Sequence, residues 1–143
     1  MIRRAQTTDT GAIRALIAQL DYDPPAALEE KIRRLSSHLD EVLLVYELDT
    51  VVVAFLSLHF IPQIAIEGDF ARISYFAVKD TARSLGIGQQ LEAHITRLAR
   101  ERNCDRIEVH CHSRRTDAHR FYERQGYNEA PKYFIKLLPA PER

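Results

Sequence analysis

The sequence predicts an α/β fold built on a mixed β-sheet, and three observations carry that prediction. Runs rich in β-branched and aliphatic residues at 41–48, 51–61 and 70–78 are typical of strands. Amphipathic helical patterns lie before and after these runs, and a glycine-containing loop at 83–88 joins a strand to a helix. With 143 residues, 45% of them hydrophobic, the chain fits one domain, 1–143, that buries its own core.

The N-terminal part is expected to hold a short strand and two helices. Residues 2–5 predict the strand, and residues 7–10 supply N-cap candidates for the first helix. The apolar face of this helix consists of Ile13, Leu16, Ile17 and Leu20. Pro25 suits the first turn of the second helix, because a proline there loses no helical hydrogen bond. Its apolar residues recur at near-helical spacing, at Leu28, Ile32, Leu35 and Leu39.

The middle of the chain predicts a hairpin followed by a third strand. Asp49 and Thr50 favour a tight turn between the strands 41–48 and 51–61. Residues 70–78 form the strand that leads into the glycine loop.

The C-terminal part predicts two helices that alternate with strands. The first of these helices begins near Gln89, and its buried apolar face is expected to consist of Ile87, Leu91, Ile95 and Leu98. A strand at 105–112 can follow it in parallel, since Ile107, Val109 and Cys111 alternate with polar residues. A helix at 116–125, ended by Gly126, precedes a last strand at 132–138. The predicted order is therefore β-α-α-β-β-β-α-β-α-β.

Composition argues against several classes of partner. Lys plus Arg and Asp plus Glu number 20 each, so no net field favours nucleic acid or an anionic membrane. The longest apolar run, 51–56, is far too short to span a bilayer, and the N-terminus lacks the apolar core of a signal peptide. Two cysteines, Cys104 and Cys111, suggest no structural disulfide. We therefore expect a soluble cytoplasmic protein.

The loop Arg83-Ser84-Leu85-Gly86-Ile87-Gly88 has the features of a phosphate site. A helix that begins beside closely spaced glycines offers unpaired N–H groups and the positive end of its dipole to an anion. A Walker loop would need a lysine after the last glycine, where this chain has Gln89. The dinucleotide fingerprint would need a third small residue where this chain has Leu91.

What remains, Arg-x-x-Gly-x-Gly after a strand, resembles the pyrophosphate-binding loop of the GNAT N-acetyltransferase superfamily. The downstream pattern Ala118-x-x-Phe121-Tyr122-x-x-x-Gly126-Tyr127 is similar to the second signature of that superfamily. The resemblance implies a GNAT-like central mixed sheet of six to seven strands and about four helices. It further implies that the strands before and after the 87–98 helix splay apart at a coenzyme A cleft.

The resemblance also implies functional residues and acetyl-CoA as cosubstrate, without a metal. The pyrophosphate would bind Arg83 and the backbone N–H groups of Ser84, Leu85, Gly86, Ile87, Gly88 and Gln89. The pantetheine arm would pair with the backbone of Phe76, Ala77 and Val78. Tyr122 would donate a proton to the departing thiolate, whose conjugate acid has a pKa of about 8.5.

The general base is not identified by the resemblance. Ser74 stands where many superfamily members carry a glutamate that deprotonates the acceptor amine through water. Asp80 replaces a common proline, and Ser84 replaces a frequent glycine. Candidate bases are His59, Glu67, Asp69, Glu108, His110 and His112. His110 and His112 share one strand face, but no third ligand follows at metal-site spacing, so we expect no metal.

The sequence favours an enzyme that transfers acetyl from acetyl-CoA directly to a primary amine, with a small-molecule acceptor preferred over a protein amino group. An acyl-CoA-binding regulatory module without catalysis is the alternative, which Ser74 keeps open. The connection 21–23 is acidic and aromatic, so it could line a site for a cationic amine or form only a polar turn. Nucleic-acid binding near Arg114 has little support, and a homodimer is one option for the assembly state.

Overall fold

The computed structural model describes residues 1–111, 113–130 and 132–140, in two compact units. Met1–His110 form the first unit, and Cys111–Arg143 form the second. The units are described separately below.

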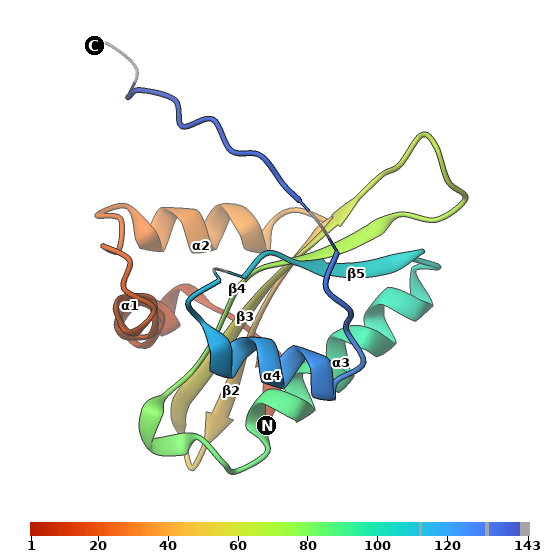
Figure 1. The fold of residues 1–143 in the computed structure, drawn as a ribbon. Coiled ribbons are helices and arrows are strands. Elements are labelled where there is room, and N and C mark those ends of the chain that lie inside the picture. The colour runs from red at the N-terminus through yellow and green to blue at the C-terminus, as the bar shows by residue number, and fades with distance from the viewer. Residues whose placement is uncertain (112, 131, 141–143) are drawn as a thin grey trace. The chain divides into compact units, whose positions relative to one another are not determined.

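The first unit is organised on a five-stranded mixed sheet with strand order β1-β2-β3-β4-β5 (Figure 1). The strands are β1 (Ile2–Arg4), β2 (Glu41–Leu48), β3 (Val51–Ile61), β4 (Phe70–Val78) and β5 (Arg106–Val109). Neighbours are antiparallel except β4 and β5, which are parallel. The predicted hairpin is confirmed. Asp49 and Thr50 both have positive φ, 49° and 68°, as a two-residue type I′ turn requires.

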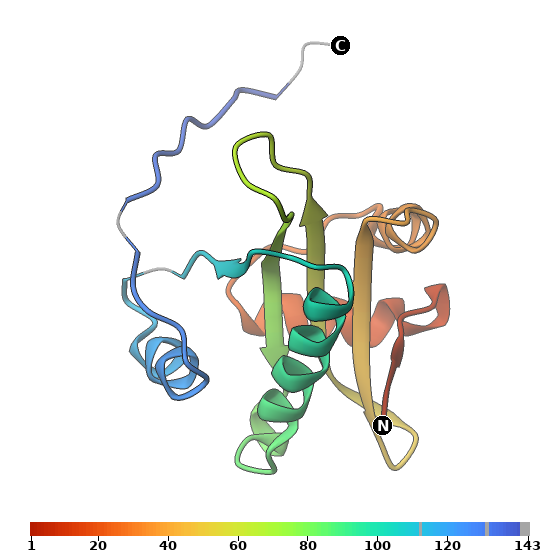
Figure 2. The ribbon, with the colours of Figure 1, turned by 90° about the vertical axis from the view of Figure 1, so that its right-hand side faces the viewer.

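Three helices cover the two faces of this sheet. They are α1 (Thr10–Gln19), which follows a short 3-10 turn (Thr7–Asp9), α2 (Leu28–Ser36) and α3 (Ile87–Glu101). Figure 2 shows α3 in front of the sheet and α1 behind it. The core beneath α1 and α2 contains Ala5, Ile13, Leu16, Leu28, Ile32, Leu43, Val45, Phe55 and Ala77. None of the described helices has the length and apolar character needed to cross a membrane.

The second helix is shorter than the sequence suggested. It begins at Leu28, so Pro25 lies before it rather than in its first turn. It ends at Ser36, and Leu39 is 92% exposed rather than part of the apolar face. The side chains of Ser36 and Ser37 donate to backbone carbonyls of the helix, which satisfies its C-terminal end before Leu39 is reached.

The second unit contains α4 (Thr116–Arg124). Gly126 ends it with φ 94°, and the N–H of Tyr127 donates to the Tyr122 carbonyl at 3.0 Å, which confirms the predicted left-handed terminator.

One strand prediction was wrong, and another was too long. Residues 132–138 form no strand, so the sheet has five strands rather than six to seven. A strand needs a neighbour for its backbone hydrogen bonds, and the described residues of the second unit contain no other strand. Phe134 and Ile135 are accordingly 91% and 73% exposed. The strand predicted at 105–112 is shorter, Arg106–Val109, and His112 lies outside the described residues.

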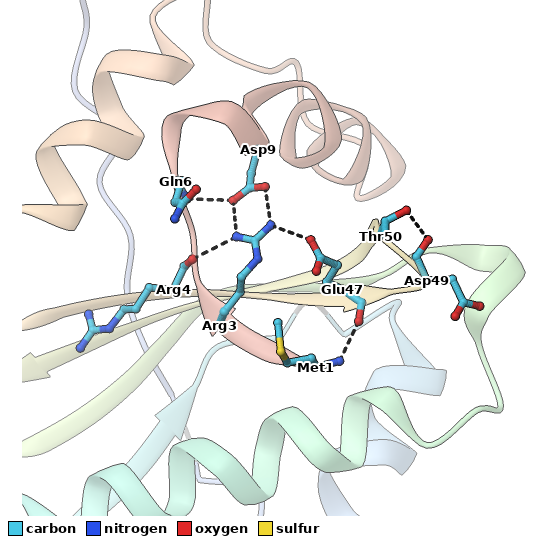
Figure 3. Close-up of polar contacts among 8 residues, drawn as sticks. All are labelled: Met1, Arg3, Arg4, Gln6, Asp9, Glu47, Asp49 and Thr50. Atoms are coloured by element: carbon cyan, nitrogen blue, oxygen red, sulfur yellow. Dashed lines mark hydrogen bonds and ion pairs between the residues drawn. The ribbon is translucent and has the colours of Figure 1, made fainter.

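An ion pair fastens β1 to the sheet and to the first turn after it (Figure 3). The guanidinium of Arg3 donates to both carboxylate oxygens of Asp9, at 2.8 and 2.9 Å, and to Glu47 Oε1 at 3.2 Å. The N–H of Gln6 donates to Asp9 Oδ2 at 2.8 Å. Asp9 is only 6% exposed, and its hydrogen bond from Arg3 lowers the pKa of its carboxyl.

Asp9→Asn should therefore destabilise the protein at neutral pH, by about 1.5 to 3 kcal/mol, because it leaves the Arg3 guanidinium without its carboxylate. A carboxyl whose pKa is lowered by folding stabilises above its unfolded pKa of about 3.9 and loses that effect as the pH falls through the folded value. Denaturant unfolding should thus show a constant difference from the parent between about pH 5 and 8 that narrows below about pH 4.

Asp49→Asn, the same atomic change in an exposed turn, is the control and should change stability by less than about 0.5 kcal/mol. A difference between parent and Asp9→Asn that stays constant down to pH 2 would contradict the role given to the Asp9 carboxylate.

Candidate active site

The connection between β4 and α3 is shaped by two left-handed residues. After a 3-10 turn at Asp80–Ala82, Ser84 has φ 71° and Gly86 has φ 78°. Ile87, 3% exposed, then anchors the helix start in the core. The N–H of Gln90 makes the first helical hydrogen bond, to the Gly86 carbonyl at 3.1 Å. The N–H groups at Ile87, Gly88 and Gln89 precede that bond, so they lack helical acceptors.

The outer surface of this loop is open and suits an anion. Residues 83–86 are exposed, and a Cβ added to Gly86 would meet no atom within 4 Å. Arg83 Nη2 lies 3.0 Å from Asp80 Oδ1, but both side chains are more than half exposed, so this pair is weak and the guanidinium can turn to a ligand. The N–H groups, the helix dipole and Arg83 together fit the pyrophosphate of coenzyme A.

Gln19 braces the start of this connection, a role that no sequence pattern predicted. Its side-chain NH₂ donates to the Val78 carbonyl at 2.8 Å, and its Oε1 accepts from the Asp80 N–H at 3.0 Å. One amide at the end of α1 thereby holds the backbone on either side of Lys79.

The strand β4 carries an irregularity at its centre. Ser57 of β3 lies opposite Tyr75 and Leu58 lies opposite Ile73, so Ser74 is the extra residue of a β-bulge. The parallel pairing with β5 ends at Ile73 and Val109, while β4 continues to Val78. The residues predicted to face the pantetheine arm, Phe76, Ala77 and Val78, therefore lie beyond the part of β4 that pairs with β5.

At the bulge, three side chains from three strands form a hydrogen-bonded chain. Ser74 Oγ lies 2.5 Å from His59 Nε2, and His59 Nδ1 makes a short contact with Glu41 Oε2. The side chains of His59 and Glu41 are 24% and 27% exposed, and Ser74 is exposed. Glu41 was not among the predicted functional residues, because its contact with His59 depends on the strand register.

The described contacts of the other candidates for the general base lie elsewhere, not at Ser74. Glu108 accepts from Arg72 Nη2 at 2.7 Å on β5. Glu67 and Asp69 belong to the connection between β3 and β4, where the Asp69 carbonyl accepts from the Asp105 N–H. His110 is exposed after β5, and His112 lies outside the described residues.

An aromatic pair lies next to the hydrogen-bonded chain. The rings of Tyr22 and Tyr75 meet edge to face, with centroids 5.3 Å apart, and are 51% and 42% exposed. Tyr22 comes from the connection 21–23, so the structure brings this acidic connection to the bulged part of β4.

In the second unit, Tyr122 packs edge to face against both Phe121 and Tyr127, each with a centroid distance of 5.3 Å. Burial is the main cause that raises the pKa of the Tyr122 phenol. Cys111 raises this pKa further, and Arg115 lowers it in part. The phenol therefore keeps its proton at neutral pH. Burial also raises the pKa of the Cys111 thiol, which argues against a thiolate nucleophile at this position.

Comparison with known proteins decides the family. The family model "Acetyltransferase (GNAT) family" matches residues 11–127. The chain belongs to this family. Its members use acetyl-CoA as the acyl donor, so the protein is an acyltransferase of the N-acetyltransferase type.

An individual relative supports this assignment, and two solved structures share the fold. The chain is 30% identical over 143 residues to an aminoalkylphosphonate N-acetyltransferase of Salmonella typhimurium, covering 96% of this chain and 90% of the relative. A transcriptional regulator from Bacillus halodurans C-125 superposes with a TM-score of 0.88 at 23% identity, covering 96% of this chain and 99% of that one.

An aminoglycoside N-acetyltransferase in complex with CoA superposes with a TM-score of 0.83 at 16% identity, covering 98% of this chain and 95% of that one. At these identities the two structures show the fold alone.

The left-handed conformation of Ser84 generates a test of the loop. A side chain in this conformation costs about 1 kcal/mol, and a β-branched one costs more. Ser84→Gly should keep the loop geometry and bind acetyl-CoA at least as tightly as the parent. Ser84→Val should weaken binding by about tenfold or more, because its backbone must leave the left-handed region.

Calorimetric titration with acetyl-CoA measures both effects, and thermal unfolding confirms that each variant is folded. If Ser84→Val bound acetyl-CoA as tightly as the parent, the left-handed turn would not matter for the coenzyme.

Proposed function

We propose that the protein transfers the acetyl group of acetyl-CoA directly to the primary amine of a small molecule. The observation that carries this proposal is the β4–α3 connection, in which left-handed Ser84 and Gly86 expose the first N–H groups of α3 at an open surface. Acetyl-CoA, when bound, supplies an activated acetyl thioester.

Residues of the first unit are proposed to hold the coenzyme. Arg83 and the backbone N–H groups of Ser84, Leu85, Gly86, Ile87, Gly88 and Gln89 bind its pyrophosphate. The backbone of Phe76, Ala77 and Val78 binds the pantetheine arm, which the end of the β4–β5 pairing at Ile73 supports.

Tyr122 is proposed to serve the leaving group. Its buried phenol stays protonated at neutral pH, so it can donate a hydrogen bond to the departing sulfur. The reference pKa of tyrosine is about 10 and that of a thiol about 8.5, so complete proton transfer is uphill. Stabilisation of the sulfur by that hydrogen bond is therefore the larger part of the expected effect.

The acceptor is proposed to approach the bulged part of β4 from the connection 21–23. Tyr22 and Tyr75 offer an apolar wall, and Asp21 and Asp23 flank Tyr22 with negative charge that attracts an ammonium group. The relative that acts on aminoalkylphosphonates supports a small amine over a protein amino group. Raised thiol pKa values at Cys104 and Cys111 favour direct transfer over an acetylated cysteine.

Three further predictions concern the number of domains, the cellular location and the assembly state. A single domain is supported by one family match that spans residues 11–127. Cytoplasmic location and homodimer formation rest on the sequence alone.

A panel of amines assayed for release of free coenzyme A tests the proposal. It should include 2-aminoethylphosphonate, an aminoglycoside, phenethylamine and a lysine-containing peptide. We expect turnover of at least one small amine well above hydrolysis. Tight binding of acetyl-CoA without thiol release from any member would instead favour the acyl-CoA-binding module.

The coenzyme assignment is tested by Gly88→Val. Gly88 is the second residue of α3, where a β-branched side chain would block the approach of the pyrophosphate. The affinity for acetyl-CoA should fall at least about tenfold in calorimetric titration. Gly11→Val places the same side chain at the second residue of α1, where an added Cβ meets no atom within 4 Å, and should leave the affinity unchanged. Equal affinities in the two variants would refute the assignment.

Tyr122→Phe keeps the ring and removes the hydroxyl. We expect acetyl-CoA affinity to be unchanged and kcat to fall by about 10²-fold, because the lost hydrogen bond acts on the leaving group. Tyr133→Phe, the same change at an exposed tyrosine, serves as the control. Parent-like kcat in Tyr122→Phe across the pH range would mean that another group or water serves the sulfur.

A further inference from the structure

We propose that Ser74, His59 and Glu41 form a proton relay that deprotonates the acceptor amine, with His59 as the final proton acceptor. This inference rests on the proposed function. It assigns the general base, a role that Ser74 cannot fill alone in place of a glutamate.

The sheet register holds the three residues on one face. Glu41 lies opposite His59 on adjacent strands, and Leu43, two residues after Glu41, packs in the core beneath α1 and α2. The relay therefore lies on the α1–α2 side of the sheet. The bulge turns Ser74 toward the same side, where its hydroxyl reaches His59 Nε2 at 2.5 Å.

The contacts favour one tautomer of the neutral imidazole. The carboxylate of Glu41 can only accept, so His59 Nδ1 carries the hydrogen that points to it. Nε2 then presents its lone pair to the Ser74 hydroxyl at 2.5 Å, closer than the Ser57 carbonyl, which lies 3.4 Å from Ser74 Oγ. This is the same division of roles that orients the histidine in a Ser-His-carboxylate triad.

Charged groups of neighbouring strands line up with His59 across the sheet. Arg72 of β4 lies opposite His59, and Glu108 of β5 lies opposite Arg72 and accepts from it at 2.7 Å. Arg106 Nη1 also lies 4.0 Å from Glu108 Oε2, so the charged groups aligned with His59 are two carboxylates, Glu41 and Glu108, and two guanidinium groups, Arg72 and Arg106. Tyr75 and Tyr22 flank the relay from β4 and from the connection after α1.

Acetyl transfer and the accompanying proton transfers can be followed bond by bond. The amine nitrogen forms a bond to the acetyl carbon, the carbon–sulfur bond breaks, and its electron pair leaves with sulfur. The nitrogen gives a proton to Ser74 Oγ as the Ser74 hydroxyl proton moves to His59 Nε2, and Glu41 stabilises the imidazolium. The imidazolium then loses its proton to solvent, through the exposed hydroxyl of Ser74.

The relay also explains how a serine can occupy this position. A hydroxyl is too weak a base to take a proton from an ammonium group by itself, whereas an imidazole titrates near neutral pH. Ser74 therefore transmits the proton, His59 stores it, and Glu41 acts as a positioning residue.

The test measures kcat/KM against pH for the parent, His59→Gln, Glu41→Gln and Ser74→Ala, using the panel amine that the parent acetylates fastest. His59→Gln should lower kcat/KM at pH 7 by about 10²-fold or more, with acetyl-CoA affinity unchanged. The loss should shrink as the pH approaches the acceptor's own pKa, because free amine then no longer needs a base. His94→Gln, a histidine of α3 in contact with Arg97, is the control and should match the parent.

The pH profile separates a relay from a structural role. The acidic limb of the parent profile should be absent in His59→Gln. Glu41→Gln should lower kcat/KM but keep that limb, because it disturbs only the orientation of the imidazole. Ser74→Glu in the His59→Gln background should recover part of the turnover by supplying a strand carboxylate. A His59→Gln profile that coincides with the parent profile would overturn the relay.

Two measurements do not depend on the acceptor. Nitrogen-15 spectra of the imidazoles should show His59, assigned by its loss in His59→Gln, as the Nδ1–H tautomer, and the Nε2–H tautomer would overturn the relay. Intact mass after incubation with acetyl-CoA alone should be unchanged, whereas one acetyl group that Ser74→Ala abolishes would make Ser74 a nucleophile instead. If the parent binds acetyl-CoA yet acetylates no amine, the proposed function fails even when the tautomer is as expected.

Discussion

The extra residue that β4 accommodates at Ser74 is the feature on which the proposed relay depends. It places two consecutive side chains, Ser74 and Tyr75, opposite the single residue Ser57 of β3. Beyond the bulge the pairing is regular again, and Ala77 lies opposite Phe55 in the core beneath α1 and α2. The bulge therefore presents two adjacent side chains on one face without disturbing the core that follows.

The helix α1 connects the two halves of the site in the first unit. Its last residue, Gln19, holds the backbone at Val78 and Asp80, where the proposed coenzyme-binding loop begins. A few residues later Tyr22 reaches Tyr75, beside the proposed relay. Because Ile13 and Leu16 bury the helix against the sheet, the proposed donor and acceptor sides share one rigid support. Displacement of α1 would disturb both sides together.

The sequence predicted those features whose determinants are local. The bounds of β2, β3 and β4 were right because runs of β-branched residues end at turn residues, such as Asp49 and Thr50. The helix terminator Gly126 was right because it directly follows a helical pattern. The signature around Tyr122 carried the family assignment, which the match over residues 11–127 confirms.

Features that depend on register or on partners were not predictable in this way. Glu41 and His59 are far apart in sequence and meet only because β2 and β3 pair with one particular alignment. No residue pattern announces the bulge at Ser74 or the brace made by Gln19. Residues 132–138 have the composition of a strand, but composition cannot supply the neighbouring strand that its backbone needs.

Distributing a base over three strands has a physical consequence that a single strand carboxylate would not have. A lone glutamate needs only its own strand, whereas the relay requires the registers of β2, β3 and β4 to hold at once. Glu41 begins β2, at the end where strand pairing frays most readily, and the short contact with His59 ties that end to β3. The hydrogen bonds that would tune the imidazole for catalysis are thus also contacts that keep these strand ends in register, so chemistry and local stability are coupled through the same atoms.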